Sequence, residues 1–292
     1  MLRYHRGKYY DEYMTHFSKD SFDLRLKEHR DSCTWSEIIL SNEDTTIGYL
    51  KLAEKMAEKY LDICEIFSNK VDNLSIVDVG CAEGMYSFLP LHHFSKLQII
   101  AFEPDIVRAK IFMEMYDVFK EKYHYYDWNN NIHIDLFDCV IGDGNSEVSY
   151  LRHYECEKTG GGAGSSTTSK IDRPNKKSVD IKSESIKLDD LTAICEKVDI
   201  LKIDVEGGEL SVLEGAKNFI NTYRPIIFLE VHLGPIFGNV DQKQIFNIIN
   251  QTSVEFKISW KQFEPLDDNN SLVYYILIPL HLLPTPTLET KK

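Results

Sequence analysis

The sequence has no closely spaced cysteines. Its six cysteines, among 292 residues, lie far apart and form no CxxC pair, which excludes the common zinc-binding and thioredoxin-like motifs. Three of them stand within apolar or helical patterns. We therefore expect free thiols in a reducing compartment.

Positive charge and long apolar runs are also scarce. The chain carries 33 Lys and Arg against 46 Asp and Glu, a formal net charge of −13, which would repel a nucleic-acid backbone. The first residues contain no apolar leader segment, and the most apolar late stretch, SLVYYILIPLHLL, is short and interrupted by Pro279. We expect a soluble, cytoplasmic protein with no membrane span and no nucleic-acid partner.

The order of the apolar patterns predicts one α/β catalytic domain with additions. Residues 1–70 form an N-terminal extension, in which apolar side chains recur at helical spacing over 47–67. Over residues 71–281, strand-like and helix-like segments alternate, as in a parallel sheet with helices on both faces. Two final strands have the pattern of an antiparallel hairpin, and residues 282–292 are predicted to be a tail.

Residues 147–188 interrupt this alternation. Two segments of period two flank EKTGGGAGSSTTSKIDRPNKK, which predicts an inserted β-hairpin with a flexible Gly/Ser-rich tip. The glycine-rich run lacks the GK[ST] ending of a phosphate loop, so we do not expect it to bind a nucleoside triphosphate. The insertion and the N-terminal extension are either acceptor-covering elements or plain surface.

The stretch IVDVGCAEGMYSF joins a buried strand to a helix. The strand ends near Asp78 and turns through Gly80 and Gly84, and glycines there let the backbone approach a ligand at a helix N-terminus. The middle glycine of the GxGxxG dinucleotide pattern is missing, since Ala82 stands in its place. On its own the loop fits a tight strand-to-helix connection as well as a ligand site.

The next strand ends on a carboxylate, Glu103, nineteen residues after Gly84. A carboxylate at this distance commonly binds the two ribose hydroxyls of an adenosine ligand. The following strand supplies VIGDG, in which Asp143 either meets an adenine edge or forms a turn. Together these features fit S-adenosylmethionine or a nicotinamide cofactor.

Several of these segments resemble one protein family. In order, VDVGCAEGMYS, AFEPD, VIGDGNSEVSYL, SIKLDDL, VDILKIDVEGGELSVLEGA and RPIIFLEVH look like the FkbM family of S-adenosylmethionine-dependent methyltransferases. The resemblance covers about residues 75–232. It implies a Rossmann-like, seven-stranded class I methyltransferase sheet and methyl transfer to a hydroxyl of a sugar, glycan or other small molecule.

The resemblance also implies cofactor-binding residues. They are Asp78, Gly80, Gly84 and Glu103, with Asp143 near the adenine. Beside them we expect Cys81, Ala82 and Asp204 to contact the cofactor. Relatives usually carry Asn at the position of Ala82 and an apolar residue at the position of Glu83. This departure leaves open a methyltransferase-like binding protein without catalysis, and the Glu103 loop leaves open a nicotinamide-dependent oxidoreductase.

Acidic and basic side chains follow two strands further along the chain. Asp204 and Glu206 end the first, and Glu230 and His232 end the second at the same spacing of two. Side chains two apart share a face of a strand, and ligands bind at the carboxyl ends of parallel strands. We expect the four to converge on one crevice, with Asp204 beside Gly80. Two structural alternatives remain: Glu206 caps the helix near Gly208, or Glu230 pairs with Lys202.

A hydroxyl acceptor gains from losing its proton during attack. His232 is the first candidate base, because its unperturbed pKa lies near neutrality, followed by Glu206 and then Lys202. We expect this chemistry to need no metal. The alternative is a divalent cation held by Asp204, Glu206, Glu230 and His232, which would lower the pKa of the alcohol.

Overall fold

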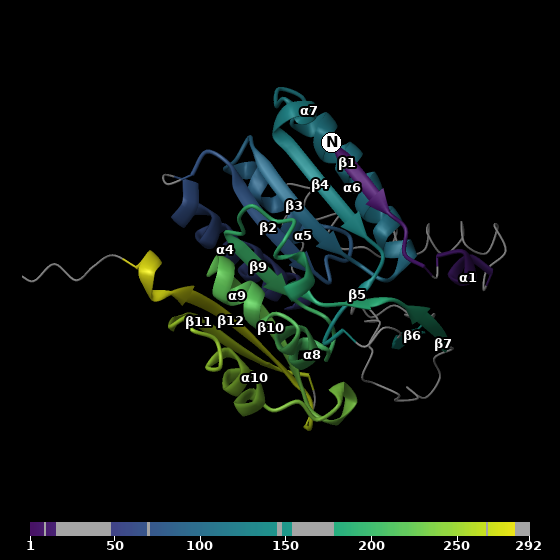
Figure 1. Cartoon of the computed structure of the whole chain (residues 1–292), viewed down its shortest axis with the longest axis vertical. Coiled ribbons are helices and arrows are strands. Elements are labelled where there is room, and N and C mark those ends of the chain that lie inside the picture. Colours follow the sequence, from purple (N-terminus) through teal and green to yellow (C-terminus); the bar gives the residue numbers. More distant parts are fainter. Residues whose placement is uncertain are drawn as a thin grey trace, which may run out of the picture.

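An eight-stranded sheet forms the centre of the computed structural model (Figure 1), which describes residues 1–8, 10–15, 48–68, 71–144, 148–153, 178–266 and 268–283. The strand order is β1-β4-β3-β2-β9-β10-β12-β11. The strands of this sheet are β1 (Leu2–His5), β2 (Leu74–Val79), β3 (Leu97–Phe102), β4 (Ile132–Phe137), β9 (Ile200–Ile203), β10 (Ile226–Leu233), β11 (Phe256–Pro265) and β12 (Ser271–Pro279).

Helices surround the sheet, and two short strand pairs stand apart from it. The helices are α1 (Tyr10–Thr15), α4 (Gly48–Ser68), α5 (Met85–Phe88), α6 (Ile106–Lys122), α7 (Trp128–Asn131), α8 (Glu209–Glu214), α9 (Lys217–Tyr223) and α10 (Gln242–Ile249). The pairs are β5 (Val140–Ile141) with β8 (Ser185–Ile186), and β6 (Val148–His153) with β7 (Ser178–Ser183).

The predicted seven-stranded sheet is present, and β1 adds an eighth strand. Strands β4, β3, β2, β9 and β10 are parallel, and β12 runs antiparallel between β10 and β11. The final hairpin therefore lies at the sheet edge, as expected. Leu2–His5 pairs in parallel with β4 at the opposite edge, although this segment was predicted only as part of a helical extension.

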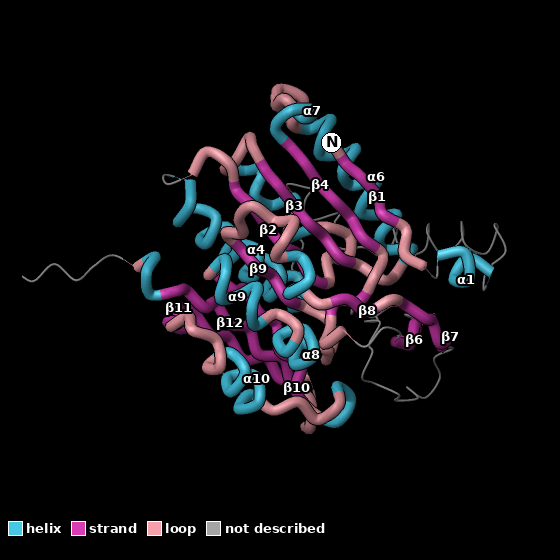
Figure 2. The backbone as a smooth tube through the Cα atoms, in the orientation of Figure 1, coloured by secondary structure: helices cyan, strands magenta, loops and turns pink. Residues whose placement is uncertain are grey.

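Helices cover both faces of the sheet (Figure 2). One buried cluster joins α4, α5 and α6 to alternate strand residues such as Ile76, and the other joins α8, α9 and α10 to residues such as Val77. Adjacent strand residues point to opposite faces, so burial on both faces produces the continuous apolar strands seen in the sequence.

The predicted N-terminal helix is confirmed as α4. Tyr60, Ile63 and Cys64 on one side of it are buried, and the Tyr60 ring meets Phe228 of β10 edge to face, with 5.4 Å between ring centroids. The helix thus packs against the central sheet. Residues 16–47 lie outside the described part of the chain.

The stretch 209–223 forms two helices, α8 and α9, separated at Gly215 and Ala216. A side chain at Gly215 would place its Cβ 2.0 Å from the Gly142 carbonyl oxygen, so the loop after β5 crosses directly over the break between α8 and α9. The crossing also lets the Asp143 N–H donate a hydrogen bond to Ser211 Oγ. Only glycine allows this approach, and it brings α8 against the end of β5.

The insertion forms the predicted hairpin, with β6 and β7 antiparallel. Its Gly/Ser-rich tip lies outside the described residues, as do residues 284–292 of the expected tail. Cys64, Cys81, Cys139 and Cys195 are free thiols and buried, and Cys33 and Cys156 fall outside the described ranges. Within those ranges no helix is both long and apolar enough to cross a membrane.

Candidate active site

A cleft opens at the carboxyl ends of the strands where the chain order reverses. Strand β2 lies between β3 and β9, and open α/β sheets bind ligands at such a switch point. The cleft measures about 810 Å³ including its open mouth. Its walls are formed by Val79, Gly80, Ala82, Phe102, Glu103, Pro104, Arg108, Cys139, Val140, Ile141, Gly142, Ser185, Asp204, Val205, Glu206, Gly208 and Ser211.

Gly80 makes the turn from β2 into this cleft. Its N–H and that of Cys81 donate hydrogen bonds of 2.9 and 3.0 Å to the Phe102 carbonyl oxygen. Its φ is +75°, and a Cβ there would lie 1.8 Å from the Asp204 carbonyl oxygen. Asp204 therefore lies beside Gly80, as predicted from the pairing of the two strands.

Glu103 stands beside the Gly80 loop, directly after the end of β3. Its Oε2 accepts the Ala82 N–H at 3.0 Å, and its Oε1 accepts the Asp105 N–H at 2.8 Å. Burial raises the pKa of Glu103 to about 8, although the nearby Arg108 guanidinium opposes this. Arg108 also lies 3.7 Å from Glu83, so the acidic residue at this unusual position has a cationic neighbour.

The predicted cofactor residues divide into two groups. Gly80, Ala82, Glu103 and Asp204 line the cleft. The remaining predicted residues, Asp78, Cys81, Gly84 and Asp143, are not part of its lining.

Each residue of the second group has another environment. Cys81 is buried in the core, and Asp143 is exposed. A Cβ on Gly84 would meet the rings of Phe88 and Phe112 at 2.6 Å, so this glycine serves the packing of α5. Since α5 has only four residues, the expected helix N-terminus contributes little positive potential.

Asp78 and Lys202 form a buried ion pair beneath the cleft. Lys202 Nζ lies 3.2 Å from Asp78 and 3.6 Å from Asp204, and donates a 2.5 Å hydrogen bond to the Gly80 carbonyl oxygen. Both side chains of the pair are almost fully buried. Burial opposes the charge of Lys202, but Asp78 and Asp204 outweigh it and raise its pKa. The pair holds the Gly80 loop against β9.

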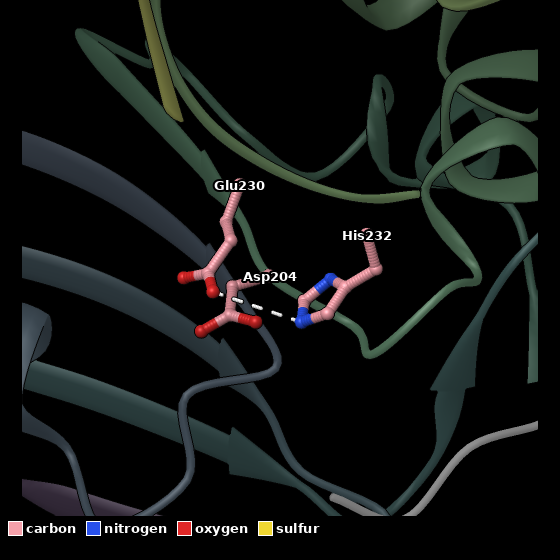
Figure 3. A group of neighbouring side chains, drawn as sticks. All are labelled: Asp204, Glu230 and His232. Carbon is pink, nitrogen blue, oxygen red and sulfur yellow. Dashed lines mark ion pairs between the residues drawn. The ribbon is translucent and has the colours of Figure 1, made fainter. Parts of the chain in front are cut away.

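Beside the cleft lies a second group of ionisable side chains, which we call the histidine–carboxylate cluster: Asp204, Glu206, Glu209, Glu230 and His232. His232 Nδ1 lies 2.8 Å from Glu209, and its Nε2 lies 3.4 Å from Glu206 and 3.6 Å from Glu230. Figure 3 shows Asp204, Glu230 and His232 turned toward one another. The predicted convergence of the two strand ends is therefore present.

The backbone conformation that brings these side chains together differs from the expected one. Strand β9 ends at Ile203, and Glu206 has a φ of +54°. Asp204 and Glu206 therefore lie on a turn and not on an extended strand. Glu206 makes no cap hydrogen bond to α8. Lys202 pairs with Asp78 and Asp204, so neither structural alternative from the sequence describes these residues.

Burial and the neighbouring charges together shift the pKa values of the cluster. Burial opposes a charged ring at His232, but Glu209, Glu206 and Glu230 outweigh it and raise its pKa well above the usual value. Burial, and next the charge of Asp204, raises the pKa of Glu230 well above its usual value. Burial likewise raises the pKa of Glu206, which His232 opposes.

Sequence reasoning missed Glu209. It is fully buried and accepts hydrogen bonds from the Gly207 N–H at 3.0 Å and from His232. Glutamate is favourable in the first turn of any helix, so its position in α8 did not mark it as a site residue. Ser211 and Gly142 also line the cleft and were not predicted from the sequence.

The family described as "Methyltransferase FkbM domain" matches residues 78–257, more than half of the chain. No curated protein matches the chain.

Two solved structures illustrate the structural similarity. Methyltransferase FkbM from Methylobacillus flagellatus KT is 16% identical with a TM-score of 0.43, over 75% of this chain and 50% of that one. The chain thus spans about half the length of that protein. Magnesium protoporphyrin IX methyltransferase from Synechocystis PCC 6803, solved with bound SAH, is 8% identical with a TM-score of 0.44, over 92% and 99%.

The family match spans the structural features described above. Residues 78–257 contain the Gly80 loop, Glu103 and the whole histidine–carboxylate cluster. The strand order adds the expected sheet. The chain belongs to the FkbM methyltransferase family.

Proposed function

We propose that the chain transfers a methyl group from S-adenosylmethionine to a hydroxyl of a sugar or another small molecule. The observation that carries the proposal is Glu103, a carboxylate beside the Gly80 loop in the wall of a cleft of about 810 Å³. Membership of the FkbM family supports the reaction class.

The residues of the cleft fit this cofactor. Each oxygen of Glu103 accepts one backbone N–H, and an ionised carboxylate retains lone pairs for two ribose hydroxyls. Val79, Phe102, Val140 and Ile141 supply an apolar wall suited to adenine. When bound, S-adenosylmethionine would supply an electrophilic methyl group on a sulfonium sulfur.

The acceptor side of the cleft is the wall formed by Asp204 and Glu206. Glu206 lines the cleft, whereas His232 is 2% exposed, lies outside the lining, and has carboxylates at both ring nitrogens. We therefore assign the proton-accepting role to Glu206, in place of His232 as expected from the sequence. Lys202, the third candidate, is enclosed by Asp78 and the Gly80 carbonyl. As the acceptor oxygen takes the methyl group, its proton passes to the Glu206 carboxylate.

Two other functions lead to different binding results. A nicotinamide-dependent oxidoreductase would bind NAD, and it has no support from the family match. Calorimetry of the full chain should detect S-adenosylhomocysteine binding and no NAD binding. NAD binding without S-adenosylhomocysteine binding would refute the proposal. Cofactor binding without product, from a panel of sugar and small-molecule alcohols, would favour a binding protein without catalysis.

Replacing Glu103 with Gln should weaken S-adenosylhomocysteine binding about 10- to 100-fold at pH 8.5, since hydrogen bonds to a charged group contribute about 1.5–3 kcal/mol. The pKa of Glu103 is about 8, so its ionised fraction rises from pH 6.5 to 8.5. The affinity of the unmodified protein should rise over the same range.

Calorimetry at several pH values tests this expectation, because the rise should be absent in Glu103→Gln. The exposed Glu196 offers a matched control, and Glu196→Gln should leave both the affinity and its pH dependence unchanged. Parallel pH curves for Glu103→Gln and the unmodified protein would contradict the role of Glu103.

Once an acceptor is identified, Glu206→Gln should slow methyl transfer about a hundredfold, the lower range of general-base effects. Glu206 is placed on the acceptor side, so S-adenosylhomocysteine affinity should change little. Single-turnover kinetics with calorimetry separate the two quantities. An unchanged rate would show that another group takes the proton.

A further inference from the structure

Three side chains of the histidine–carboxylate cluster have the arrangement of a metal site. Asp204, Glu230 and His232 each offer one ligand atom, and these atoms lie within 4.8 Å of one another. They come from the ends of adjacent parallel strands, β9 and β10, and point into one space (Figure 3). We propose that they bind one divalent cation, of the class of Mg²⁺ or Mn²⁺.

The imidazole supplies the observation that separates this site from a plain group of acids. The His232 ring is 2% exposed, and its Nε2 is turned toward Glu206 and Glu230 at 3.4 and 3.6 Å. Both distances exceed the 2.7–3.2 Å typical of N–H···O hydrogen bonds. Among the described residues, this buried ring nitrogen thus has only two long ion-pair contacts, and a cation between the groups would give it a closer partner.

The other ring nitrogen is held in the manner of a metal ligand. Glu209 is fully buried, and its Oε1 lies 2.8 Å from His232 Nδ1. Histidine ligands almost always donate their second N–H to a carboxylate, carbonyl or water, which fixes the tautomer and directs the ligating nitrogen. Glu209 is itself fixed by the Gly207 N–H. It therefore orients Nε2 toward Asp204 and Glu230.

The donor set selects the class of cation. Two carboxylates and one imidazole offer hard oxygen ligands and no thiolate, which suits Mg²⁺ and Mn²⁺. Lys202 lies 3.6 Å from Asp204 Oδ2. A carboxylate has two oxygens, so Asp204 can keep this ion pair with one oxygen and offer the other to the cation.

The site places the cation at the cleft. Asp204 is both a ligand and a cleft-lining residue, so a hydroxyl entering from the cleft would reach the cation and be polarised by it. Only this catalytic role depends on the proposed function, because cation binding rests on the geometry alone. The proposed cation site differs from the metal-free chemistry expected from the sequence. That expectation was made without knowing where Glu209 and the two ring nitrogens of His232 lie.

Titration of the full chain with Mn²⁺, without cofactor or acceptor, tests the site by electron paramagnetic resonance. We expect one tightly bound Mn²⁺ per chain. His232→Ala and Glu230→Gln should abolish this binding. Glu209→Gln should weaken it about 10- to 100-fold, the usual effect of losing an outer partner of a ligand. Glu196→Gln, an exposed acid outside the cluster, should not change it.

A measurement on the unmodified protein covers the case in which a variant does not fold. Electron spin-echo envelope modulation of bound Mn²⁺ should show coupling to a ¹⁴N nucleus of His232. Absence of tight Mn²⁺ binding, bound Mn²⁺ without nitrogen coupling, or binding that survives in folded His232→Ala and Glu230→Gln would each overturn the proposal. Because the probe is the metal alone, these outcomes are distinct from failure of cofactor binding.

Discussion

Lys202→Met will destabilise the protein by about 3–5 kcal/mol, the usual cost of removing one partner of a buried ion pair. Asp78 is fully buried and Lys202 is 1% exposed, so the substitution leaves the Asp78 carboxylate without its cation. It also removes the 2.5 Å hydrogen bond to the Gly80 carbonyl. Urea denaturation followed by circular dichroism measures the free energy of unfolding.

Lys197 provides a matched control for this loss. It also forms an ion pair, with Asp199 at 2.8 Å, but its side chain is 40% exposed. Because exposed pairs contribute about 0–1 kcal/mol, Lys197→Met should cost about 1 kcal/mol or less. The double variant Asp78→Asn/Lys202→Met should be less destabilised than the sum of its single variants. An equal loss of unfolding free energy in Lys202→Met and Lys197→Met would show that the buried pair contributes no more than the exposed one.

Gly80→Ala should also destabilise the protein by about 3 kcal/mol or more, which places it among the larger effects of single substitutions. Two causes act together. A left-handed backbone costs an alanine about 1–2 kcal/mol, and the new Cβ would lie 1.8 Å from the Asp204 carbonyl oxygen. This oxygen belongs to the backbone after β9, so relief requires movement of the loop or of the strand end.

The Gly80→Ala substitution should also weaken ligand binding. Since Gly80 and Asp204 both line the cleft, folded Gly80→Ala protein should bind S-adenosylhomocysteine more than tenfold more weakly, for a change of about 1.4 kcal/mol or more. Gly238 has a similar φ of +80° and is exposed. Gly238→Ala therefore controls for the left-handed backbone alone. If calorimetry and denaturation give the same values for both variants, the close approach at Gly80 has no role.

Much of the fold was predictable because its determinants are local. The continuous apolar strand before Asp78 and the periodic residues of α4 report burial within a few residues of themselves. Glu103 was also predictable, because a strand-end carboxylate follows the glycine loop at a regular distance. The Gly80–Asp204 contact followed once β2 and β9 were taken as neighbours.

The features that the sequence did not predict depend on contacts between distant parts of the chain. Glu209 and His232 are 23 residues apart and meet only because α8 folds back over the end of β10. Leu2–His5 is too short for a pattern to mark it as a strand, and it forms one because β4 leaves an edge to pair with. Gly84 resembled a glycine of a ligand-binding loop, but a glycine is needed there because the rings of Phe88 and Phe112 leave no room for a Cβ.

Residue order alone was enough to establish an alternating α/β domain, the glycine loop, Glu103 and acids at two strand ends, because each depends on neighbours in the chain. The position of His232 between Glu209, Glu206 and Glu230 depends on packing across the whole sheet. Packing buried the predicted His232, set it against Glu209, which was not predicted, and turned it toward the predicted Glu206 and Glu230. The physical reason is that strand ends are encoded locally, whereas the angles at which helices and strands meet arise from burial of their shared apolar faces.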